Sequence, residues 1–503
     1  MPLARAWSVA LFGVDGVAVE IEADIGGGRP RTQIVGLPDA SLNEAKERVR
    51  AAVRNSQRKW PDELVTLALS PAALPKGGSS YDVALACAVL VAAGLEPAER
   101  LEKTVLMGEL ALDGRIRTIR GVLPALLAAK RARLRRAIVP VQTLPEAALV
   151  TDLEVLGAEH LTEVLSWLRG EYDLPRTPTE HRTAPPPEIP DLVDVVGQPE
   201  ARWALEVAAA GGHHLLMTGP PGTGKTMLAQ RLPGLLPPLT HNQALEVTAI
   251  HSIAGLLSPE SPLVTTPPFI APHHTCSVPA LVGGGVGLAK PGAISTAHNG
   301  VLLLDEACEF AADRLEALRT ALEEGEIRLA RRDGVARYPA RFQLVLATNP
   351  CPCAPAREFD CTCRPHAKRR YMARLSGPLL DRVDLRVRMR PITALSRVDV
   401  PPEPTAEVRA RVAKARARAA ERWHKHGWLT NAQAPGPILR RDFGLPREVT
   451  ALLDRGLDIG AVTARGADRC LRVSWTLADL AEVEQPTADH VAAALEFRDR
   501  RVA

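Results

Sequence analysis

The sequence contains no run of apolar residues close to the ~18 that a helix needs to span a bilayer. Its N-terminal stretch WSVALFGVDGVAVEIEADI acquires acidic residues where a signal peptide would carry small residues for cleavage. A strong charge of either sign is also missing, because 62 Lys and Arg nearly balance 58 Asp and Glu and leave a net charge of +4. We therefore expect a cytoplasmic protein with no membrane partner, and any argument for nucleic-acid binding must rest on local charge.

The chain is long enough, at 503 residues, for roughly three domains. Six prolines between 175 and 190 predict an extended linker over 174–192. Upstream, residues 1–173 mix alternating strand-like and helix-like segments, which predicts an α+β domain. Downstream, residues 193–395 repeat apolar strand, loop and helix, the pattern of a parallel α/β sheet, and 396–503 read as helices broken by prolines.

A phosphate-binding loop stands out in HHLLMTGPPGTGKTMLAQ, residues 213–230. It follows an apolar strand-like run and precedes a helix-like one, which is the context that such a loop requires. Lys225 is expected to reach the β- and γ-phosphate oxygens of ATP, and the Thr226 hydroxyl to hold Mg²⁺. The residues expected around the nucleotide are Gly219, Pro220, Pro221, Gly222, Thr223, Gly224, Lys225 and Thr226.

Two further apolar strands end in polar residues. GVLLLDEACEF places Asp305 where it would complete the Mg²⁺ site and Glu306 where it would orient or deprotonate the attacking water. FQLVLATNP, residues 342–350, places Asn349 at the end of a strand. An amide there can align that water, although a strand-end cap is an equally good interpretation of Asn349 alone.

Together these motifs resemble the AAA+ ATPases, and other segments resemble the YifB/ComM family of the magnesium-chelatase-like branch. The family segments are RLSGPLLDRVDL (374–385), ADRCLRVSWTLADL (467–480), APHHTCSVPALVGGG and PGAISTAHNGVLLLDE. The resemblance covers nearly the whole chain. It implies a Lon-like N-terminal domain, a P-loop core with a helical lid, and a homo-oligomeric ring, a hexamer, that uses ATP and Mg²⁺.

The resemblance also assigns arginines to the nucleotide. In such rings a neighbouring subunit supplies an arginine to the γ-phosphate, and Arg382 matches that position, with Arg374 as second candidate and a surface ion pair as the alternative for either. Arg472 matches the family's lid arginine and would report the nucleotide state. Arg469 beside it is expected to be structural.

The N-terminal domain resembles Lon-type proteases in LSPAALPKGGSSYDVALACAVL and in MGELALDGRIRTIRGVLPALLAAKRARLRRAIVP. By that match Ser80 takes the place of the nucleophile and Leu123 the place of the catalytic lysine. Leucine cannot accept a proton, so we expect a domain without proteolytic chemistry. Lys76 and Lys130 are the other lysines that could act as a base.

Four of the eight cysteines crowd into the loop 351–363 as C-x-C-x7-C-x-C. Four thiolates suit tetrahedral Zn²⁺, and a loop of this length can bring both pairs together. Unligated cysteines or one disulfide are the alternatives. The candidate zinc ligands are Cys351, Cys353, Cys361 and Cys363.

Residues 327–342, IRLARRDGVARYPARF, predict a hairpin that turns at Asp333-Gly334. In the replicative helicases that the chain resembles, a hairpin inserted before the sensor strand projects into the central channel and touches DNA. Arginine suits that role because phosphates accept its bidentate hydrogen bonds. A solvated edge hairpin whose charges deter aggregation is the alternative. The expected DNA contacts are Arg328, Arg331, Arg332 and Arg337.

A second basic segment, TAEVRARVAKARARAAERWHKHGW, carries seven Lys and Arg between 409 and 425, and a solvated helix face is its favoured interpretation over a DNA contact. His273 and His274 are expected in a loop that faces the channel or a neighbouring subunit, and not in a metal site.

The family resemblance implies a motor that drives branch migration on single-stranded or branched DNA, in the recombination of incoming DNA during natural transformation. The alternative is a chelatase-type chaperone that uses ATP to remodel a protein partner without nucleic acid. A shared ATPase fold does not decide between them, and the arginine hairpin favours the first.

Overall fold

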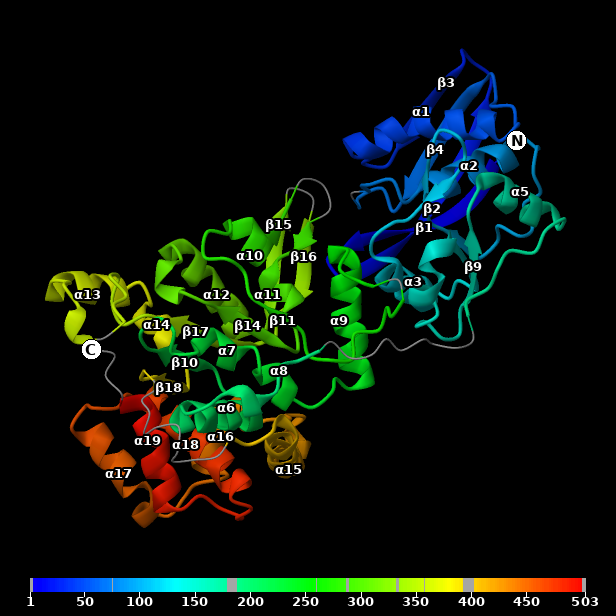
Figure 1. Cartoon of the computed structure of the whole chain (residues 1–503). Coiled ribbons are helices and arrows are strands. Elements are labelled where there is room, and N and C mark those ends of the chain that lie inside the picture. The colour runs from blue at the N-terminus through cyan, green and yellow to red at the C-terminus, as the bar shows by residue number, and fades with distance from the viewer. Residues whose placement is uncertain are drawn as a thin grey trace.

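The fold is described from a computed structural model of the chain. It contains three parts, an N-terminal α/β domain, a central domain built on a parallel sheet, and a C-terminal bundle of helices (Figure 1). The expected fold class is therefore confirmed. The structure describes residues 3–74, 76–178, 188–258, 260–285, 289–331, 334–356, 358–391 and 402–499. The centre of the predicted linker, 179–187, lies outside these ranges.

The N-terminal domain is built on a seven-stranded mixed sheet in the order β3-β4-β2-β1-β5-β8-β9. Buried and more exposed residues alternate along β2, as expected for a strand covered on one face only. Helix α2, of which ten residues are buried, packs against the sheet beside α1 and in contact with β1 and β2. The strands are β1 (Leu3–Phe12), β2 (Asp15–Gly26), β3 (Arg31–Val35), β4 (Leu64–Ser70), β5 (Thr104–Leu106), β8 (Arg136–Pro140) and β9 (Glu154–Ala158), and the main helices are α1 (Ala40–Asn55), α2 (Asp82–Ala92), α3 (Val122–Arg131) and α5 (Leu161–Arg169).

The central domain contains a five-stranded sheet in the order β11-β14-β17-β10-β18, and every pair in it is parallel. The three central strands, β14, β17 and β10, are continuous buried runs because both faces of the sheet are covered there. The carboxyl ends of β10, β14 and β17 meet at one edge, where ligands of such sheets bind. The strands are β10 (Leu215–Thr218), β11 (Phe269–Ile270), β14 (Val301–Leu304), β17 (Gln343–Thr348) and β18 (Leu385–Arg388), and the helices include α6 (Pro199–Gly211), α7 (Lys225–Ala229), α8 (Leu232–Leu235), α9 (His241–Ala254) and α12 (Ala312–Glu324).

The predicted arginine hairpin is present as β15 (Glu326–Arg331) and β16 (Gly334–Pro339). Its register pairs Arg331 with Gly334, so Gly334, expected in the turn, begins β16, while Asp333 of the predicted turn lies outside the described residues. Ile327 and Tyr338 are opposite each other on the buried face. Arg328 and Arg337 are opposite each other on the exposed face.

The N-terminal domain docks on this hairpin and on α9 (Figure 1). The Val14 N–H donates to the Arg337 carbonyl at 3.4 Å. Gly13 has φ +63°, and a Cβ there would lie 2.1 Å from the same carbonyl oxygen, so only glycine permits this approach. Glu146 joins the two domains as well, since it accepts hydrogen bonds from the Leu123 N–H and from the Ser252 hydroxyl of α9.

The C-terminal bundle, the lid, begins with the basic helix α15, and the expectation of a solvated face is wrong for most of its cations. Arg411 binds Glu206 of α6, Arg416 donates to the Ala209 carbonyl, and Arg422 binds Asp479 of α18. These side chains hold α15 against the core and the rest of the lid. The lid helices are α15 (Thr405–Trp423), α16 (Gly436–Arg441), α17 (Arg447–Asp458), α18 (Ala464–Leu480) and α19 (Ala488–Asp499).

Candidate nucleotide-binding site

The loop between β10 and α7 forms an open cradle. Gly222 and Gly224 have φ of +76° and +88°, a left-handed conformation that glycine adopts without strain. A Cβ at Gly222 would have no atom within 4 Å, so this turn is open to a ligand. The Thr223 hydroxyl donates to the Pro220 carbonyl at 2.9 Å and closes the loop. The loop therefore has a shape that can surround a phosphate group, with backbone N–H groups at the start of α7 as hydrogen-bond donors.

Lys225 lies at the centre of the site. Its ammonium donates to the carbonyls of Gly219 at 2.7 Å and Pro220 at 2.9 Å, and to Asn349 Oδ1 at 3.1 Å. Burial lowers the pKa of Lys225, and the nearby carboxylates of Asp305 and Glu306 act in the opposite direction. The structure thus brings together residues that lie more than 120 positions apart in sequence.

The residues predicted to hold Mg²⁺ are in direct contact. Thr226 Oγ1 donates to Asp305 Oδ2 at 2.6 Å, so a hydroxyl and a carboxylate oxygen converge at the end of β14. This donor set fits Mg²⁺, which takes few protein oxygens and leaves its other positions to water and phosphates. Glu306 follows with φ +52°, and its carboxylate is about half exposed beside the cradle.

One residue of this site was not predicted. His274 Nδ1 lies 3.1 Å from Glu306 Oε2, because the loop holding His274 leaves β11, the strand beside β14. The expectation that His273 and His274 face a channel or a neighbour missed this contact. The signal that could have found it is the short apolar stretch Phe269-Ile270 before the histidines, since polar residues after adjacent parallel strands meet at one edge.

The three arginines predicted to act on the nucleotide are hydrogen-bonded or ion-paired to other groups. Arg382 binds Glu323 and donates to the Pro378 carbonyl. Arg374 donates to the Cys308 carbonyl and pairs with Glu309 at 3.3 Å. Arg472 donates to the Ala434 carbonyl at 2.7 Å within the lid. Within the described part of the chain, none of these guanidinium groups is hydrogen-bonded to the phosphate loop or to Asp305 and Glu306.

A buried polar network joins the lid to the core beside Arg382. Arg469 of α18 binds Asp384 and donates to the Arg382 carbonyl at 3.0 Å. His213 contacts Asp384 at 3.1 Å and Thr476 at 2.7 Å. Burial would raise the pKa of Asp384, but Arg469 and His213 outweigh it and hold that pKa well below its usual range. The structural role expected for Arg469 agrees with these contacts.

The four cysteines of the loop 351–363 gather at one point, with their sulfur atoms within 4.8 Å of one another. Three sulfur pairs, 351–353, 353–361 and 351–361, are each 3.5 Å apart. A tetrahedral site with Zn–S bonds of ~2.3 Å would place sulfurs about 3.8 Å apart, whereas a disulfide needs about 2.05 Å. The backbone N–H of Cys363 lowers the pKa of the Cys361 thiol to about 6, aided by the neighbouring thiols and Lys368. The cluster therefore fits zinc better than a disulfide.

Neither lysine considered as a base for Ser80 is free to act on it in the described part of the N-terminal domain. Ser80 lines a cavity of about 320 Å³ together with Glu109 and Arg120. Lys76 is fully buried, and its ammonium donates to the carbonyls of Gly36, Leu69 and Pro71. Lys130 pairs with Asp152 at 3.0 Å. Leu123 is buried, so the place of a catalytic lysine is part of the hydrophobic core.

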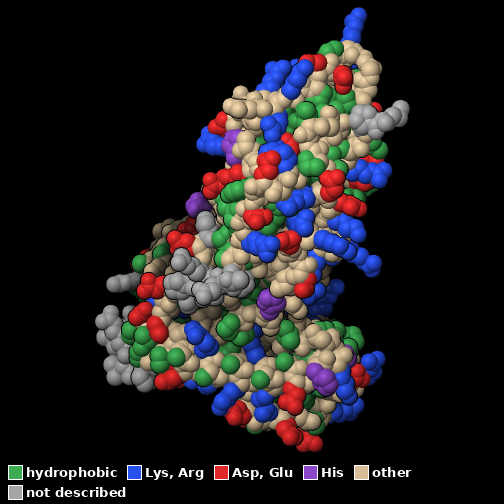
Figure 2. Space-filling view, turned by 90° about the vertical axis from the view of Figure 1, so that its right-hand side faces the viewer, with side chains coloured by type: hydrophobic (Ala, Val, Ile, Leu, Met, Phe, Trp, Pro, Cys, Tyr) green, Lys and Arg blue, Asp and Glu red, His purple; other side chains and the backbone are tan. Residues whose placement is uncertain are grey.

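The predicted DNA-contacting arginines differ in their surroundings. Arg328 is exposed but paired with Glu324 and Glu326. Arg337 is exposed on the same face. Arg332 and the side chain of Arg331 lie outside the described residues. On the face seen in Figure 2, Lys and Arg side chains are interspersed with Asp and Glu, as the small net charge suggests. No helix in the described ranges is long and apolar enough to span a membrane.

Comparison with known proteins identifies the family of the chain. Residues 191–396 match the family model of magnesium chelatase subunit ChlI, and 21–143 and 402–498 match further models for that subunit and its C-terminal part. An uncharacterized protein of Mycobacterium tuberculosis is 60% identical over 498 residues, which cover 99% of each chain. A shorter match, 28% identical over 162 residues, covers 30% of this chain and 20% of Lon protease 2 of Herpetosiphon aurantiacus.

Two named relatives match from end to end. Competence protein ComM of Haemophilus influenzae is 40% identical over 506 residues, covering 99% of this chain and 98% of ComM. The uncharacterized protein YifB of Escherichia coli is 40% identical over 501 residues, covering 99% of this chain and 97% of YifB. The chain therefore belongs to the YifB/ComM family of magnesium-chelatase-like AAA+ proteins.

Proposed function

We propose that this protein is an ATPase motor that forms a hexameric ring and acts on single-stranded or branched DNA. The observation that carries the proposal is the position of the arginine hairpin, β15–β16. It is inserted between β14, which leads to Glu306, and β17, which leads to Asn349. Helix α12 connects the segment with Glu306 to the start of the hairpin, and only residues 340–342 separate the end of the hairpin from β17.

The chemistry follows from the same residues. Lys225 and the phosphate loop would bind the ATP phosphates, Thr226 and Asp305 would hold Mg²⁺, and Glu306 would accept the proton of the attacking water. Bound Mg²⁺ neutralises charge that develops on the phosphates. Asn349, held by Lys225, would position the water. Arg382 of a neighbouring subunit would complete the site, after exchanging Glu323 for the γ-phosphate.

The hairpin is suited to a phosphate backbone. Its apolar side is covered, whereas Arg328 and Arg337 are exposed on the opposite side, where a ligand could meet them. Guanidinium groups bind phosphates without reading base sequence, which suits a protein that moves along DNA. In this proposal the biological role is branch migration in recombination of incoming DNA, as the resemblance to ComM suggests.

Salt-dependent binding of fluorescent single-stranded and forked DNA tests the proposal. The paired change Arg331→Ala and Arg332→Ala is expected to weaken binding about tenfold and to lower the slope of log K against log salt by about 1.4, which is ~0.7 for each lost phosphate contact. The matched control is Arg29→Ala with Arg31→Ala, which removes two exposed arginines from the N-terminal domain. ATP turnover that no DNA stimulates, but that a protein partner does, would instead support the chaperone alternative.

A further inference from the structure

A cavity of about 780 Å³ lies at the edge of the central sheet opposite the phosphate loop. Gly300 and Gln343, at the amino ends of β14 and β17, line it together with Glu324 at the end of α12. From the lid, Arg416 of α15 and residues of the loop 427–433 line it. The volume is typical of sites for small molecules, and a molecule bound there would touch both the core and the lid.

Arg416 differs from Arg411 of the same helix because no acidic side chain pairs with it. Its Nε donates to the Ala209 carbonyl at 2.8 Å, and its two Nη groups have no acceptor within the described part of the chain. Arg411 instead binds Glu206 and Glu403, and both raise its pKa. Burial alone acts on Arg416 and lowers its pKa to about 10. A guanidinium removed from water without a counter-ion is costly, so the cavity favours an anion.

Other hydrogen-bond donors line the same cavity. His214 Nδ1 accepts the Leu344 N–H, so the neutral ring carries its proton on Nε2. Gln433 Oε1 accepts two backbone N–H groups of its own loop, which leaves the amide nitrogen as a donor. Neither of these nitrogens, nor Trp428 Nε1, is hydrogen-bonded to an acceptor among the described residues. The lining therefore offers several donors to the oxygens of a ligand.

The two acidic residues in the described lining of the cavity are already paired. Glu323 binds Arg382, and Glu324 lies 3.4 Å from Arg328. These two arginines balance the charges of both carboxylates. Arg416 therefore remains without a counter-ion from its own chain.

Trp428 gives the cavity an aromatic surface. Its ring stacks on that of His426, with centroids 4.4 Å apart and 10° between the planes, and it meets the Trp423 ring at 5.8 Å. These contacts hold the indole in one orientation. A planar ring of a ligand can pack against such a surface, which adds to the attraction of the cation for its anionic group.

We propose that this cavity binds a small organic anion, a carboxylate or phosphate group carried on a planar ring, with the anionic group at Arg416 and the ring against Trp428. The site is separate from the nucleotide site, because the two lie at opposite edges of the same parallel sheet. The proposal goes beyond the ATPase function and does not depend on it.

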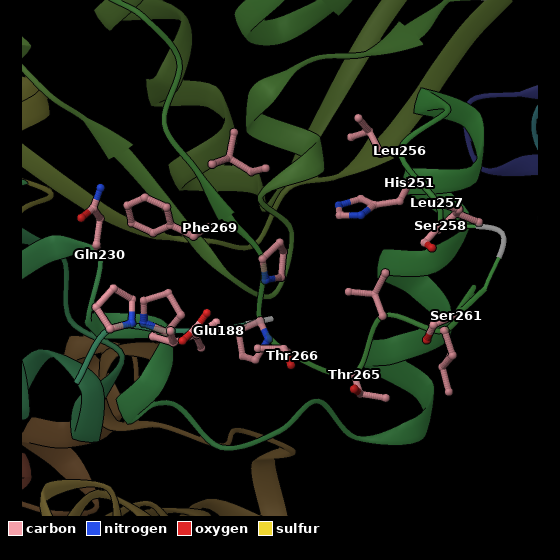
Figure 3. Close-up of a pocket in the computed structure, with 18 residues that line it drawn as sticks. Glu188, Gln230, His251, Leu256, Leu257, Ser258, Ser261, Thr265, Thr266 and Phe269 are labelled. Atoms are coloured by element: carbon pink, nitrogen blue, oxygen red, sulfur yellow. The ribbon is translucent and has the colours of Figure 1, made fainter. Parts of the chain in front are cut away.

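The cavity drawn in Figure 3 shows by contrast what such a site requires. It has a volume of about 730 Å³ and is lined mainly by apolar side chains, including Leu257 and Phe269. No Lys or Arg is found in its described lining, and its His251 already donates to the Thr296 carbonyl at 2.9 Å. That cavity therefore has no charge for an anion to balance.

Calorimetric titration of the full-length chain with four probes tests the proposal. Benzoate and phenyl phosphate carry a ring, and acetate and inorganic phosphate are their ringless counterparts. Each ring-bearing probe is expected to bind about tenfold more tightly than its counterpart. Lys225→Ala should bind phenyl phosphate as the parent does, because Lys225 belongs to the opposite edge of the sheet. The tighter of the two ring-bearing probes identifies the anionic group as carboxylate or phosphate.

Three variants assign the binding to this cavity. Arg416→Met keeps the length of the side chain and is expected to weaken binding of both ring-bearing probes at least about tenfold. Trp428→Leu is expected to abolish the preference for a ring. Lys414→Met is the control, because it removes one exposed positive charge from the same helix, and binding should stay within about twofold of the parent.

Thermal unfolding separates a ligand contact from a structural one. Arg416→Met leaves no acid unpaired and is expected to unfold within about 3 °C of the parent, whereas Arg411→Met leaves Glu206 and Glu403 unpaired and should unfold several degrees earlier. An Arg416→Met protein that unfolds as early as Arg411→Met would overturn the proposal by making Arg416 structural. Equal binding by Arg416→Met and the parent, a ring preference that survives Trp428→Leu, or no binding of any probe at about 10 mM would also overturn it.

Discussion

The ammonium of Lys225 donates a hydrogen bond to Asn349 Oδ1 at 3.1 Å, so the phosphate loop and the end of β17 meet at one point. The two residues follow adjacent parallel strands, in which Thr218 is level with Thr348. The same ammonium also holds two carbonyls of the loop. Bound phosphates would have to replace some of these partners, and Asn349 would then be free to position a water molecule.

Asn349→Ala is therefore expected to lower kcat for ATP by about 10²-fold, because the attacking water loses an oriented partner, with little change in KM. Phosphate release measures the rate, and titration with a fluorescent ATP analogue measures binding. Asn43→Ala on α1, in the N-terminal domain, is the control and should leave both unchanged. A loss of nucleotide affinity equal to the loss of rate would mean that Asn349 only supports the loop.

The cysteine cluster predicts one zinc ion per chain. Cys361→Ser is expected to lower the zinc content well below one and to make the loop 351–363 sensitive to proteases, since the bonds that close it are lost. Elemental analysis and limited proteolysis check this. Cys276→Ser, outside the cluster, should keep the metal. Parent protein that carries under half a zinc per chain would contradict the assignment.

Arg469→Ala is expected to destabilise the contact between lid and core by about 3–5 kcal/mol, because it leaves the buried Asp384 carboxylate without its main partner. Thermal unfolding of the variant should begin at lower temperature. The control is Arg465→Ala, an exposed position on the same helix, for which a change within about 0.5 kcal/mol is expected. Equal stability of both variants would show that the network contributes little.

The core is expected to lose stability as the pH falls from about 6.5 to about 4. Burial lowers the pKa of His214 to about 4, and its Nδ1 accepts the Leu344 N–H at 3.0 Å. The unfolded chain therefore binds a proton in this window that the folded chain does not, and folding loses about 1–2 kcal/mol, allowing for the partial exposure of the ring.

Unfolding temperatures measured at pH 7.5 and 5.0 test this dependence on His214. His214→Asn, whose amide oxygen can accept the same N–H without titrating, should show a smaller difference between the two pH values than the parent. An identical difference in parent and variant would assign the acid sensitivity to other groups.

The main features of the fold and of the nucleotide site were predictable from local patterns. The phosphate loop, Asp305-Glu306 and Asn349 each follow a run of apolar residues, and parallel strands bring their carboxyl ends to one edge. The parallel core and the helical lid were predictable for the same reason. Gly334 was expected in the hairpin turn but begins β16, because the register of β15 and β16 depends on which face packs against the rest of the protein.

Contacts between distant segments were not predictable in this way. The sequence of α15 reads as a solvated basic helix, yet Arg411 and Arg422 bind acids that lie 205 and 57 positions away. Thr476 and Asp479 are polar residues of α18, yet both are buried and hydrogen-bonded. The sequence shows that such a residue is polar, but only packing decides whether its hydrogen bonds are made with water or with another side chain.

The sequence by itself determined the phosphate chemistry of this protein, because glycine spacing, a lysine at the start of a helix and acids at the end of a strand act over a few neighbouring residues. Only the tertiary structure decided that His274 meets Glu306 and that the N-terminal domain covers one side of the arginine hairpin. Two polar side chains interact directly only when their atoms come within about 3 Å, and for segments far apart in the chain that distance is set by the packing of the whole fold.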